Sequence, residues 1–487
     1  MKKFVLIGSL MIAMVAAQAQ DYTNAVKYNQ SFNIGDARYS AMGGAFSALG
    51  NNHSSIFDNP GAIGVFHGNS FEFSLNNGTS NSTTSFLDAS QKNNTNMFNG
   101  NIGLLFKMEL PDNELNAKYL NFSYSSNRVA DYNINSGFTA YNNKNSMTDE
   151  LLGRLETGYT NAITDDALST GLIYKANNNY NSDFIQYDNN GARVYNPYGS
   201  TQTQALSLKG RKNEYSYGMG TNFDNKLYLG ISLNVSSIDY TEDETYTESD
   251  TKNISPSFNS FTMYRKYEDI GRGVGYKIGL IALPVKDLRI AASYHSPVNW
   301  NIDRTTQTNM DFYYTQNDSD KSVFTNNPKN ESSYKLNTPA KFVLGLAYTF
   351  NKTLIISADY ENMNYSNAQL SNSDGTALSD ANKEIAKNAR MVSNLKFGTE
   401  LRMGAISLRA GTAFYQSPYD TYKDGYTLSY SGGIGLKDEN FYIDLAVVNS
   451  KTNNSRYLYS DYSGNNVLSS TIKSSITNVI LTLGLKF

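Results

Sequence analysis

The chain has 487 residues, a formal net charge of −3 at pH 7, and no cysteine. The missing thiols exclude disulfides and thiolate metal sites, and the near-neutral charge argues against a nucleic-acid partner. A mean hydropathy of −0.47 resembles that of a soluble protein, yet 37 Tyr, 24 Phe and 36 Gly stand against only 9 Pro. Such a composition suits a transmembrane β-barrel, in which aromatic residues meet the membrane interfaces and half of each strand faces a polar lumen.

Residues 1–19 have the pattern of a secretory signal peptide. Lys2 and Lys3 form the charged start, an apolar stretch follows, and Ala17-Gln18-Ala19 is a small-x-small cleavage site. The apolar stretch is too short to span a bilayer comfortably as a helix. We therefore expect an exported protein that loses this segment.

Residues 20–68 are predicted to form a small hatch, or plug, inside the barrel. They are too few for a separate domain but too apolar and glycine-rich for a simple tail. The pattern indicates short helical turns broken at Gly43-Gly44 and Gly50, followed by an Asn59-Pro60-Gly61 turn. The expected hatch and gating residues are Gly43, Gly44, Phe46, Phe57, Asn59 and Pro60.

Residues 69–487 are predicted to form an antiparallel transmembrane barrel. Strands are recognised by apolar and polar residues that alternate with a period of two. The final strand shows this well, with Val479, Leu481, Leu483 and Leu485 on one face. Fourteen strands are expected at 69–77, 97–108, 117–127, 215–223, 226–240, 270–283, 287–300, 338–350, 352–365, 393–403, 405–416, 426–437, 440–450 and 475–487.

The connections between these strands alternate between short and long. Tight hairpin signals stand at Asp224-Asn225, Asn351 and Gly404, whereas the intervening connections are much longer. Outer-membrane barrels have short periplasmic turns and long extracellular loops, and an even strand number returns the C-terminus to the periplasmic rim. The expected extracellular loops are 78–96, 128–214, 241–269, 301–337, 366–392 and 451–474.

The longest loop contains two amphipathic helical patterns, at 147–159 with Ser146 or Thr148 as its cap, and at 165–174. One interpretation is that the two helices form an apolar groove that captures ligand at the mouth of the barrel. The other is that they pack on each other and cover the barrel. The candidate groove residues are Leu151, Leu152, Leu155, Leu168 and Leu172.

Charged residues on the later strands are expected to point into the lumen, because an unpaired charge facing lipid costs several kcal/mol. These residues are Lys396, Glu400, Arg402 and Arg409, with Asp359 and Asp444 nearby. A salt-bridged or solvated lumen is favoured over a role in binding substrate.

The run at 37–45, Ala-Arg-Tyr-Ser-Ala-Met-Gly-Gly-Ala, followed by Asn59-Pro60-Gly61, resembles the N-terminal hatch of the FadL/TodX-type outer-membrane transporter family. Gly61 stands where that family has alanine. The segments 336–342 and 345–348 also resemble the start of a strand in the family. The resemblance implies passive transport of hydrophobic compounds, with capture at the loops, a site inside the barrel, and lateral exit after a hatch shift. It also implies an inward kink in an early strand, although 117–127 contains no Pro or Gly to mark one.

The expected function is thus hatch-gated diffusion of long-chain fatty acids or similar molecules across a Gram-negative outer membrane by a monomer. Its partners would be outer-membrane lipid and a hydrophobic small-molecule ligand. Alternatives are a component of a protein-secretion system, an adhesin, or a haemin receptor that uses His53 and His67. No zinc spacing or catalytic motif is present, so we expect no enzyme activity, metal or cofactor.

Overall fold

The structure is a computed structural model that describes residues 23–30, 32, 34–111, 116–176, 178–187, 193–195, 199–420, 425–464 and 466–487. The expected signal peptide at 1–19 lies outside the described residues. No helix in the described part of the chain is long and apolar enough to cross a membrane.

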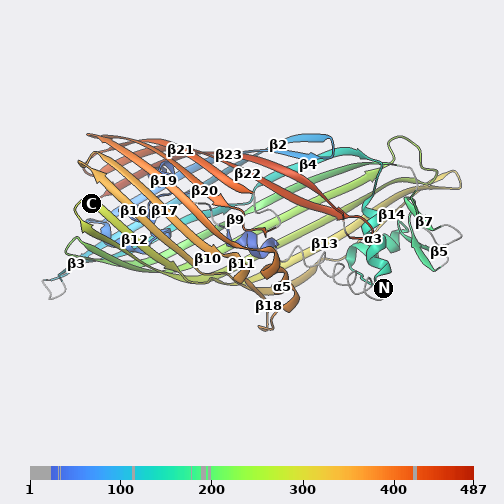
Figure 1. Cartoon of the computed structure of the whole chain (residues 1–487), viewed down its shortest axis with the longest axis horizontal. Helices are drawn as coiled ribbons and strands as arrows, with labels where there is room; N and C mark the ends of the chain where they lie inside the picture. Colours follow the sequence, from blue (N-terminus) through green and yellow to red (C-terminus); the bar gives the residue numbers. More distant parts are fainter. Residues whose placement is uncertain are drawn as a thin grey trace.

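The chain forms a closed antiparallel barrel of fourteen strands, as predicted (Figure 1). The first strand, β1 (Ser70–Phe86), pairs with both β2 (Ala89–Glu109) and the last strand, β23 (Val467–Lys486), which closes the ring. Two strands of the wall are interrupted near Pro297 and Pro339, since proline cannot donate to the ladder. The others are β3 (Ala117–Asp131), β9 (Ser200–Phe223), β10 (Leu227–Ser249), β11 (Phe258–Val285), β12 with β13 (Leu288–His295, Asn299–Gln316), β15 with β16 (Asn330–Asn337, Lys341–Phe350), β17 (Leu354–Asn364), β19 (Met391–Met403), β20 (Ile406–Gln416), β21 (Tyr426–Lys437) and β22 (Phe441–Ser460).

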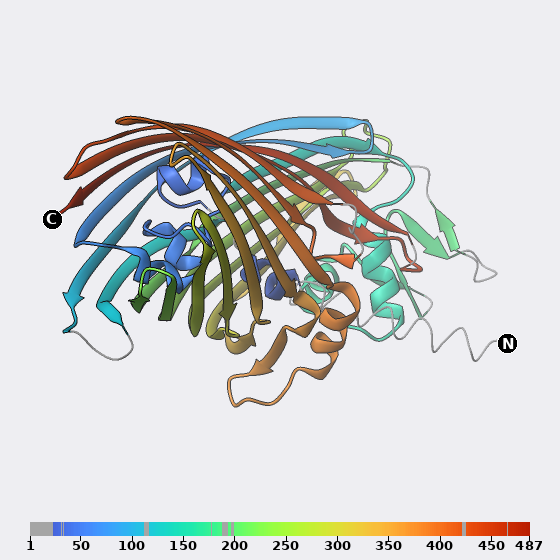
Figure 2. The same cartoon turned by 60° about the vertical axis from the view of Figure 1, so that its left-hand side comes forward.

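Shorter elements fill and cover the barrel. A helix over 23–29 and the elements α2 (Ala37–Ala41), η1 (Ser54–Phe57) and η2 (Pro60–Val65) lie inside it (Figure 2). The others belong to the connections between the strands of the wall: β4 (Ile134–Asn142), α3 (Met147–Glu156), α4 (Ala162–Thr170), β5 and β6 (Tyr174–Ala176, Asn179–Asn181), β7 and β8 (Ile185–Tyr187, Arg193–Tyr195), β14 (Ser319–Phe324), η3 (Tyr365–Asn367), β18 (Gln369–Asn372) and α5 (Ser379–Asn388).

Several segments predicted as long loops are extensions of the strands. Residues 78–96 belong to the β1–β2 hairpin, which stays paired as far as Phe86 and Ala89. Likewise, β10 and β11 remain paired up to Ser249 and Ser260, within the predicted loop 241–269. These extensions are rich in Ser, Thr, Asn and Glu, and they lack the apolar row that a lipid-facing strand needs. The prediction of loops at 78–96 and 241–269 was therefore wrong.

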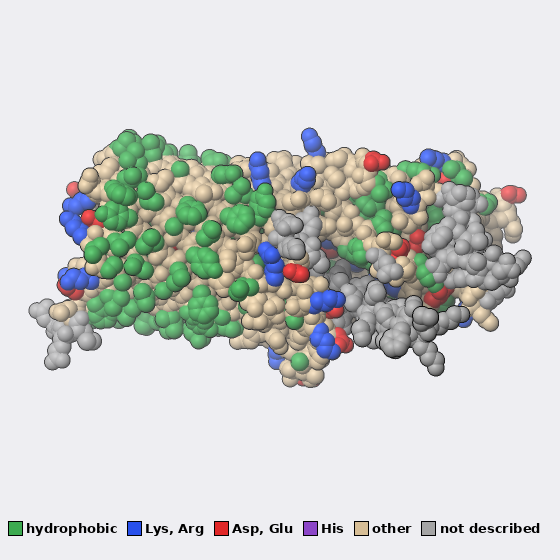
Figure 3. Space-filling view, in the orientation of Figure 1, with side chains coloured by type: hydrophobic (Ala, Val, Ile, Leu, Met, Phe, Trp, Pro, Cys, Tyr) green, Lys and Arg blue, Asp and Glu red, His purple; other side chains and the backbone are tan. Residues whose placement is uncertain are grey.

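Apolar side chains cover the outer surface at the end of the barrel that carries the short turns (Figure 3). In β10 this surface contains Leu227, Leu229, Ile231 and Leu233, which are 36–51% exposed. Exposure of large apolar side chains around a closed barrel is expected where the wall meets lipid. The wall thus has a lipid-facing half and a polar half that projects beyond the membrane.

Tight turns join the strands at the lipid-facing end. Asp224 and Asn225 both have positive φ, at 51° and 54°, and so do Asn351 and Lys352, at 47° and 60°. Two consecutive residues in this region are typical of type I′ hairpin turns. The short-turn rim is thus built as predicted.

Candidate functional site

Residues 34–66, called the hatch below, fold inside the barrel next to β1 (Figure 2). Asp36 caps α2, since its carboxylate accepts the Tyr39 N–H at 2.9 Å. The chain then turns sharply at Gly43 and Gly44, whose φ values are +65° and +72°. Only glycine adopts such angles without strain, which explains this pair in the sequence.

The hatch backbone lies directly against glycines of the barrel wall. Gly398 and Gly411 face the main chain at Met42 and Gly43, and a Cβ at either wall position would overlap these atoms. Gly220 and Gly230 lie in the same way against the main chain at Gly64 and Pro60, and Gly279 lies against the side chains of Asn59 and Pro60. These wall residues are missing from the predicted site. Their signal in the sequence is glycine at inward positions of otherwise apolar strands.

Asn59 ties together two parts of the hatch and the wall. Its amide nitrogen donates to Ser47 O at 2.9 Å and Leu280 O at 3.0 Å, while its Oδ1 accepts the Gly61 N–H at 2.9 Å. Pro60 begins η2 directly after this cap. Phe46 and Phe57 are buried, and the six predicted hatch residues all lie in this segment. Their gating role stays a prediction.

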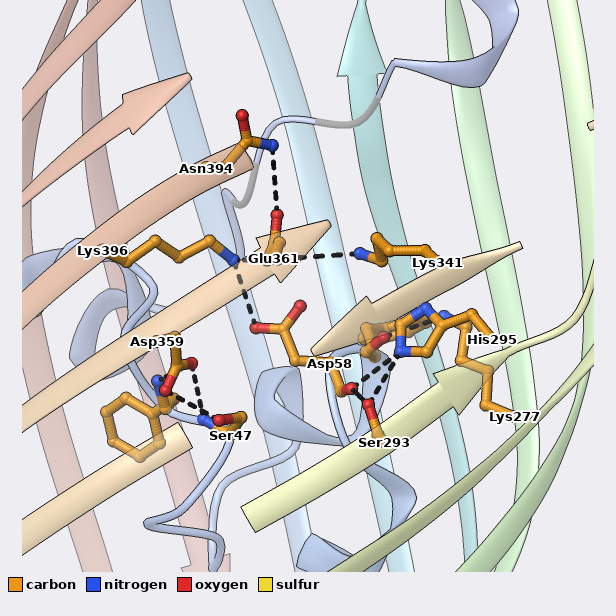
Figure 4. Close-up of polar contacts among 12 residues, drawn as sticks. Ser47, Asp58, Lys277, Ser293, His295, Lys341, Asp359, Glu361, Asn394 and Lys396 are labelled. Carbon is orange, nitrogen blue, oxygen red and sulfur yellow. Dashed lines mark hydrogen bonds and ion pairs between the residues drawn. The ribbon is translucent and has the colours of Figure 1, made fainter. Parts of the chain in front are cut away.

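Asp359 on β17 holds the hatch turn from the wall (Figure 4). Its carboxylate accepts the N–H groups of Phe46 and Ser47 at 3.0 and 2.9 Å, and the Ser47 hydroxyl at 2.7 Å. The side chain is 2% exposed. A buried carboxylate is tolerated because these three donors replace water.

Lys396 on β19 is fully buried and joins wall and hatch carboxylates (Figure 4). It pairs with Glu361, and its Nζ lies 3.7 Å from the Asp58 carboxylate of the hatch. Asp58 also accepts the Tyr39 hydroxyl at 2.6 Å, and Lys341 pairs with Glu361 at 3.6 Å. This predicted lumen charge thus helps to fix the hatch.

Glu400 lies at the centre of a second ion cluster. It accepts from Nε of Arg38, Arg402 and Arg409 at 2.8, 2.7 and 2.7 Å. Arg409 also pairs with Asp444 at 2.5 Å. Arg38 belongs to the hatch and was not among the predicted charges. The side chain of Arg402 is 42% exposed, whereas that of Glu400 is 1% exposed.

A cavity of about 90 Å³ lies between the hatch and the wall. It is called the lumen cavity below. Aromatic side chains from both parts contribute, among them Tyr39, Phe57 and Trp300. Charged side chains also line it, at Asp58, Lys212, Glu214, Lys277, Lys341 and Glu361. Polar and charged residues thus make up more of the lining than apolar ones, and the aromatic side chains supply its apolar part.

The wall is irregular where β3 borders this cavity. Pairing between β2 and β3 ends at Ile102 and Ser126, although β2 continues to Ala89. A bulge follows in β3 between Arg128 and Ala130, and β4 continues the pairing with β9 alone. Asn127 and Val129 of this interrupted segment line the lumen cavity. The interruption between β2 and the β3–β4 segment is called the seam below; β3 itself contains neither Pro nor Gly.

The five candidate groove leucines do not line an open groove. Leu151, Leu152, Leu155 and Leu172 are 0–5% exposed, and Leu168 is half-buried. They pack into an apolar cluster with Phe138, Phe258 and Phe312 of the projecting strands. We call α3, α4 and these wall residues the upper cap. Ser146 caps α3 as proposed, whereas the second helix begins earlier than predicted, at Ala162, and ends before Gly171. Ligand capture by these residues stays a prediction.

The two histidines considered as haem ligands have other partners. His53 is 2% exposed, and its Nε2 lies 3.0 Å from the Ser70 hydroxyl. Burial lowers the pKa of His53 to about 4, so its ring is neutral at ordinary pH. His67 contacts the Tyr119 hydroxyl at 2.6 Å. Among the described residues, no cluster of three His, Cys, Asp or Glu is placed to hold a metal ion.

A fourteen-stranded barrel with an N-terminal plug inside it is a recognisable fold class. No protein-family model and no curated protein matches the sequence. Solved structures do match: a Pseudomonas aeruginosa FadL homologue aligns with TM-score 0.56 and 12% identity, over 94% of this chain and 100% of that one. The Pseudomonas putida toluene transporter TodX aligns at 0.53 and 14%, and the Ralstonia pickettii toluene transporter TbuX at 0.52 and 15%. TodX and TbuX are covered over 100% and 99% of their lengths, each by 94% of this chain. The chain therefore has the fold of the FadL-type channels.

Proposed function

We propose that the protein is a passive channel for hydrophobic small molecules, such as long-chain fatty acids, in the outer membrane of a Gram-negative bacterium. The observation that carries the proposal is the position of the lumen cavity, which adjoins both the hatch and the seam in the wall. The apolar outer surface supports a membrane location, and the signal-peptide pattern supports export. The two similar toluene transporters are compatible with this class of cargo.

The proposed route leads from the lumen cavity through the lower end of the seam, where Phe98 and Ile102 of β2 are exposed on the apolar outer surface, into the surrounding lipid. The segment just before the hatch borders this exit, because the Phe32 N–H donates to Val129 O of β3 at 2.9 Å. An apolar molecule gains free energy when it moves from water into lipid, so a concentration gradient is sufficient to drive transport. The hatch would shift to open the route, and Asn59 and Asp359 are the contacts that hold it closed.

A disulfide across the seam tests the route. The Asn135 N–H donates to the Thr95 hydroxyl at 3.1 Å, so these positions of β4 and β2 lie close together. The chain has no native cysteine. In the double variant T95C/N135C we expect oxidation to abolish uptake of palmitate into proteoliposomes, and dithiothreitol to restore it.

A matched control places the disulfide within regular pairing. Thr79 and Asn96 are partners in the β1–β2 ladder, and oxidised T79C/N96C should transport palmitate at the rate of the parent. Full palmitate uptake by the oxidised seam variant would contradict lateral exit. Absence of uptake by the folded parent protein would contradict the channel function itself.

A further inference from the structure

Three uncharged polar groups of the lumen cavity have no hydrogen-bond partner among the described residues. They are the indole N–H of Trp300, both amide atoms of Asn29, and Oδ1 of Asn127. These side chains are 1%, 5% and 6% exposed, respectively, and all three line the cavity. A buried donor or acceptor without a partner costs about 1–3 kcal/mol. A ligand that pairs with them would recover this cost.

The charged groups of the same cavity are already compensated. Lys277 pairs with Glu214 and also donates to Phe57 O at 2.8 Å. Lys212 donates to Tyr28 O at 2.8 Å, and Lys341 pairs with Glu361. A carboxylate entering the described part of the cavity would therefore compete with existing anions for these ammonium groups. The groups that remain to be satisfied are neutral.

The indole of Trp300 is held in place by the wall. Its ring packs on β11 at Gly273, where a Cβ would overlap the ring atoms. Glycine at this position lets the ring lie flat against the strand. The N–H is thus presented by a fixed ring rather than by a mobile side chain, which favours a directional bond.

We propose that the lumen cavity binds an uncharged head group that both donates and accepts hydrogen bonds, such as the hydroxyl of an alcohol. A hydroxyl has one donor and two acceptor lone pairs. The unpaired atoms include donors, at Trp300 Nε1 and Asn29 Nδ2, and acceptors, at the Asn29 and Asn127 oxygens, so a hydroxyl can pair with either kind. A carboxylate only accepts, and a hydrocarbon does neither. The inference rests on the proposed function and narrows it, because among hydrophobic small molecules it favours alcohols over the fatty acids named there as the example.

The site contains its own reporter, since Trp300 is the only tryptophan of the chain. The full-length barrel in lipid nanodiscs is titrated at pH 7.5 with 1-octanol, octanoate or octane, and Trp300 emission is recorded. We expect octanol to bind at least tenfold more tightly than octanoate or octane. In Asn29→Leu and Asn127→Val the preference should fall below threefold. The control Asn337→Ala, at an exposed residue outside the cavity, should keep it.

Two further readouts separate the possible failures. Heat-modifiable gel mobility confirms that each variant barrel is folded, and only folded variants are compared. Equal affinities for octanol and octanoate, with uptake into proteoliposomes intact, would overturn the head-group preference and leave the channel standing. Unchanged Trp300 emission with all three compounds would mean that water alone satisfies the three groups, which also overturns the inference. If none of the three compounds is taken up, the proposed function itself is overturned.

Discussion

The hatch and the upper cap both fill the barrel, but different contacts hold them. The hatch places its backbone against wall glycines, and a few polar groups such as Asp359 and Glu400 fix its position. The upper cap instead buries leucines of α3 and α4 among aromatic side chains of the projecting strands. The hatch also buries Met42, Phe46 and Ile63 in an apolar cluster with wall residues, so it differs from the cap in its added backbone contacts with glycines, not in a lack of apolar packing.

This difference indicates where movement costs least. An interlocked core behaves as a packed solid, so shifting it breaks many contacts together. Where the hatch backbone lies against glycines, no wall side chain blocks its path, so its movement requires that its polar ties exchange partners and that its apolar cluster with Leu105, Tyr228 and Ile281 separates. We therefore expect the hatch to gate the channel and the upper cap to keep the mouth in shape.

The largest loss of stability is expected for Glu400→Ala. The substitution leaves Arg38 and Arg409 beside each other without their shared carboxylate, and breaking a buried ion pair costs about 3–5 kcal/mol. Guanidinium unfolding in micelles, followed by the emission of Trp300, should show a much lower midpoint. An unchanged midpoint would mean that the cluster does not stabilise the fold. The control is Glu439→Ala in an exposed short turn, which should unfold like the parent.

A comparable loss of stability, confined to the upper cap, is expected for Leu152→Ala. Leu152 is 0% exposed, and truncation of a buried leucine costs about 2–5 kcal/mol. Limited proteolysis should then cut the α3–α4 region faster, while the hatch stays protected. Leu168→Ala, at a half-buried position of α4, serves as the milder control. Equal cleavage of Leu152→Ala and the parent would argue that the cap is already open in solution.

The sequence was sufficient for the fold where each strand has one apolar face. Leu227, Leu229, Ile231 and Leu233 alternate with polar or small residues and lie on the lipid side as expected. The projecting strands were misread as loops, since a wall in contact with water on its outer face needs no apolar row. The run at 78–96 is almost wholly polar and yet fully paired.

The candidate site was predictable only on the side of the hatch. Gly43-Gly44 and Asn59-Pro60 are local signals, because turn geometry is encoded by neighbouring residues. Their wall partners depend on which residue of each strand lies level with a given part of the hatch. The alternation of residues along one strand shows which side chains face inward, but not at which level they meet the hatch. Asp359 was expected in the lumen, but its contact with the hatch turn, like the positions of Gly398 and Trp300, is found only in the folded structure. The seam also escapes prediction, since it arises where β3 ceases to pair with β2.

A smaller cost in stability, with a clear effect on permeability, is expected for Asp359→Ala. Three donors of the hatch turn lose their acceptor at about 1–3 kcal/mol for each donor that stays unpaired, and removal of the buried carboxylate offsets part of this cost, while the barrel wall is unaffected. We expect faster leakage of palmitate into proteoliposomes, with unchanged heat-modifiable mobility. Ser357→Ala, two residues away on the same inner face, is the matched control. Leakage equal to that of the parent would show that the hatch is not held by this carboxylate.

The smallest effect is expected for Arg402→Ala, although this residue was predicted as a lumen charge together with Lys396, Glu400 and Arg409. The side chain of Arg402 is 42% exposed, and its partner Glu400 keeps Arg38 and Arg409 after the substitution. Exposed ion pairs contribute about 0–1 kcal/mol and are weakened by salt. The unfolding midpoint should shift slightly at low salt and not at all at 0.5 M NaCl. A shift of the unfolding midpoint as large as that of Glu400→Ala would show that the three arginines act as one unit. The hatch would then be held by the whole cluster, not by Arg38 and Arg409 alone.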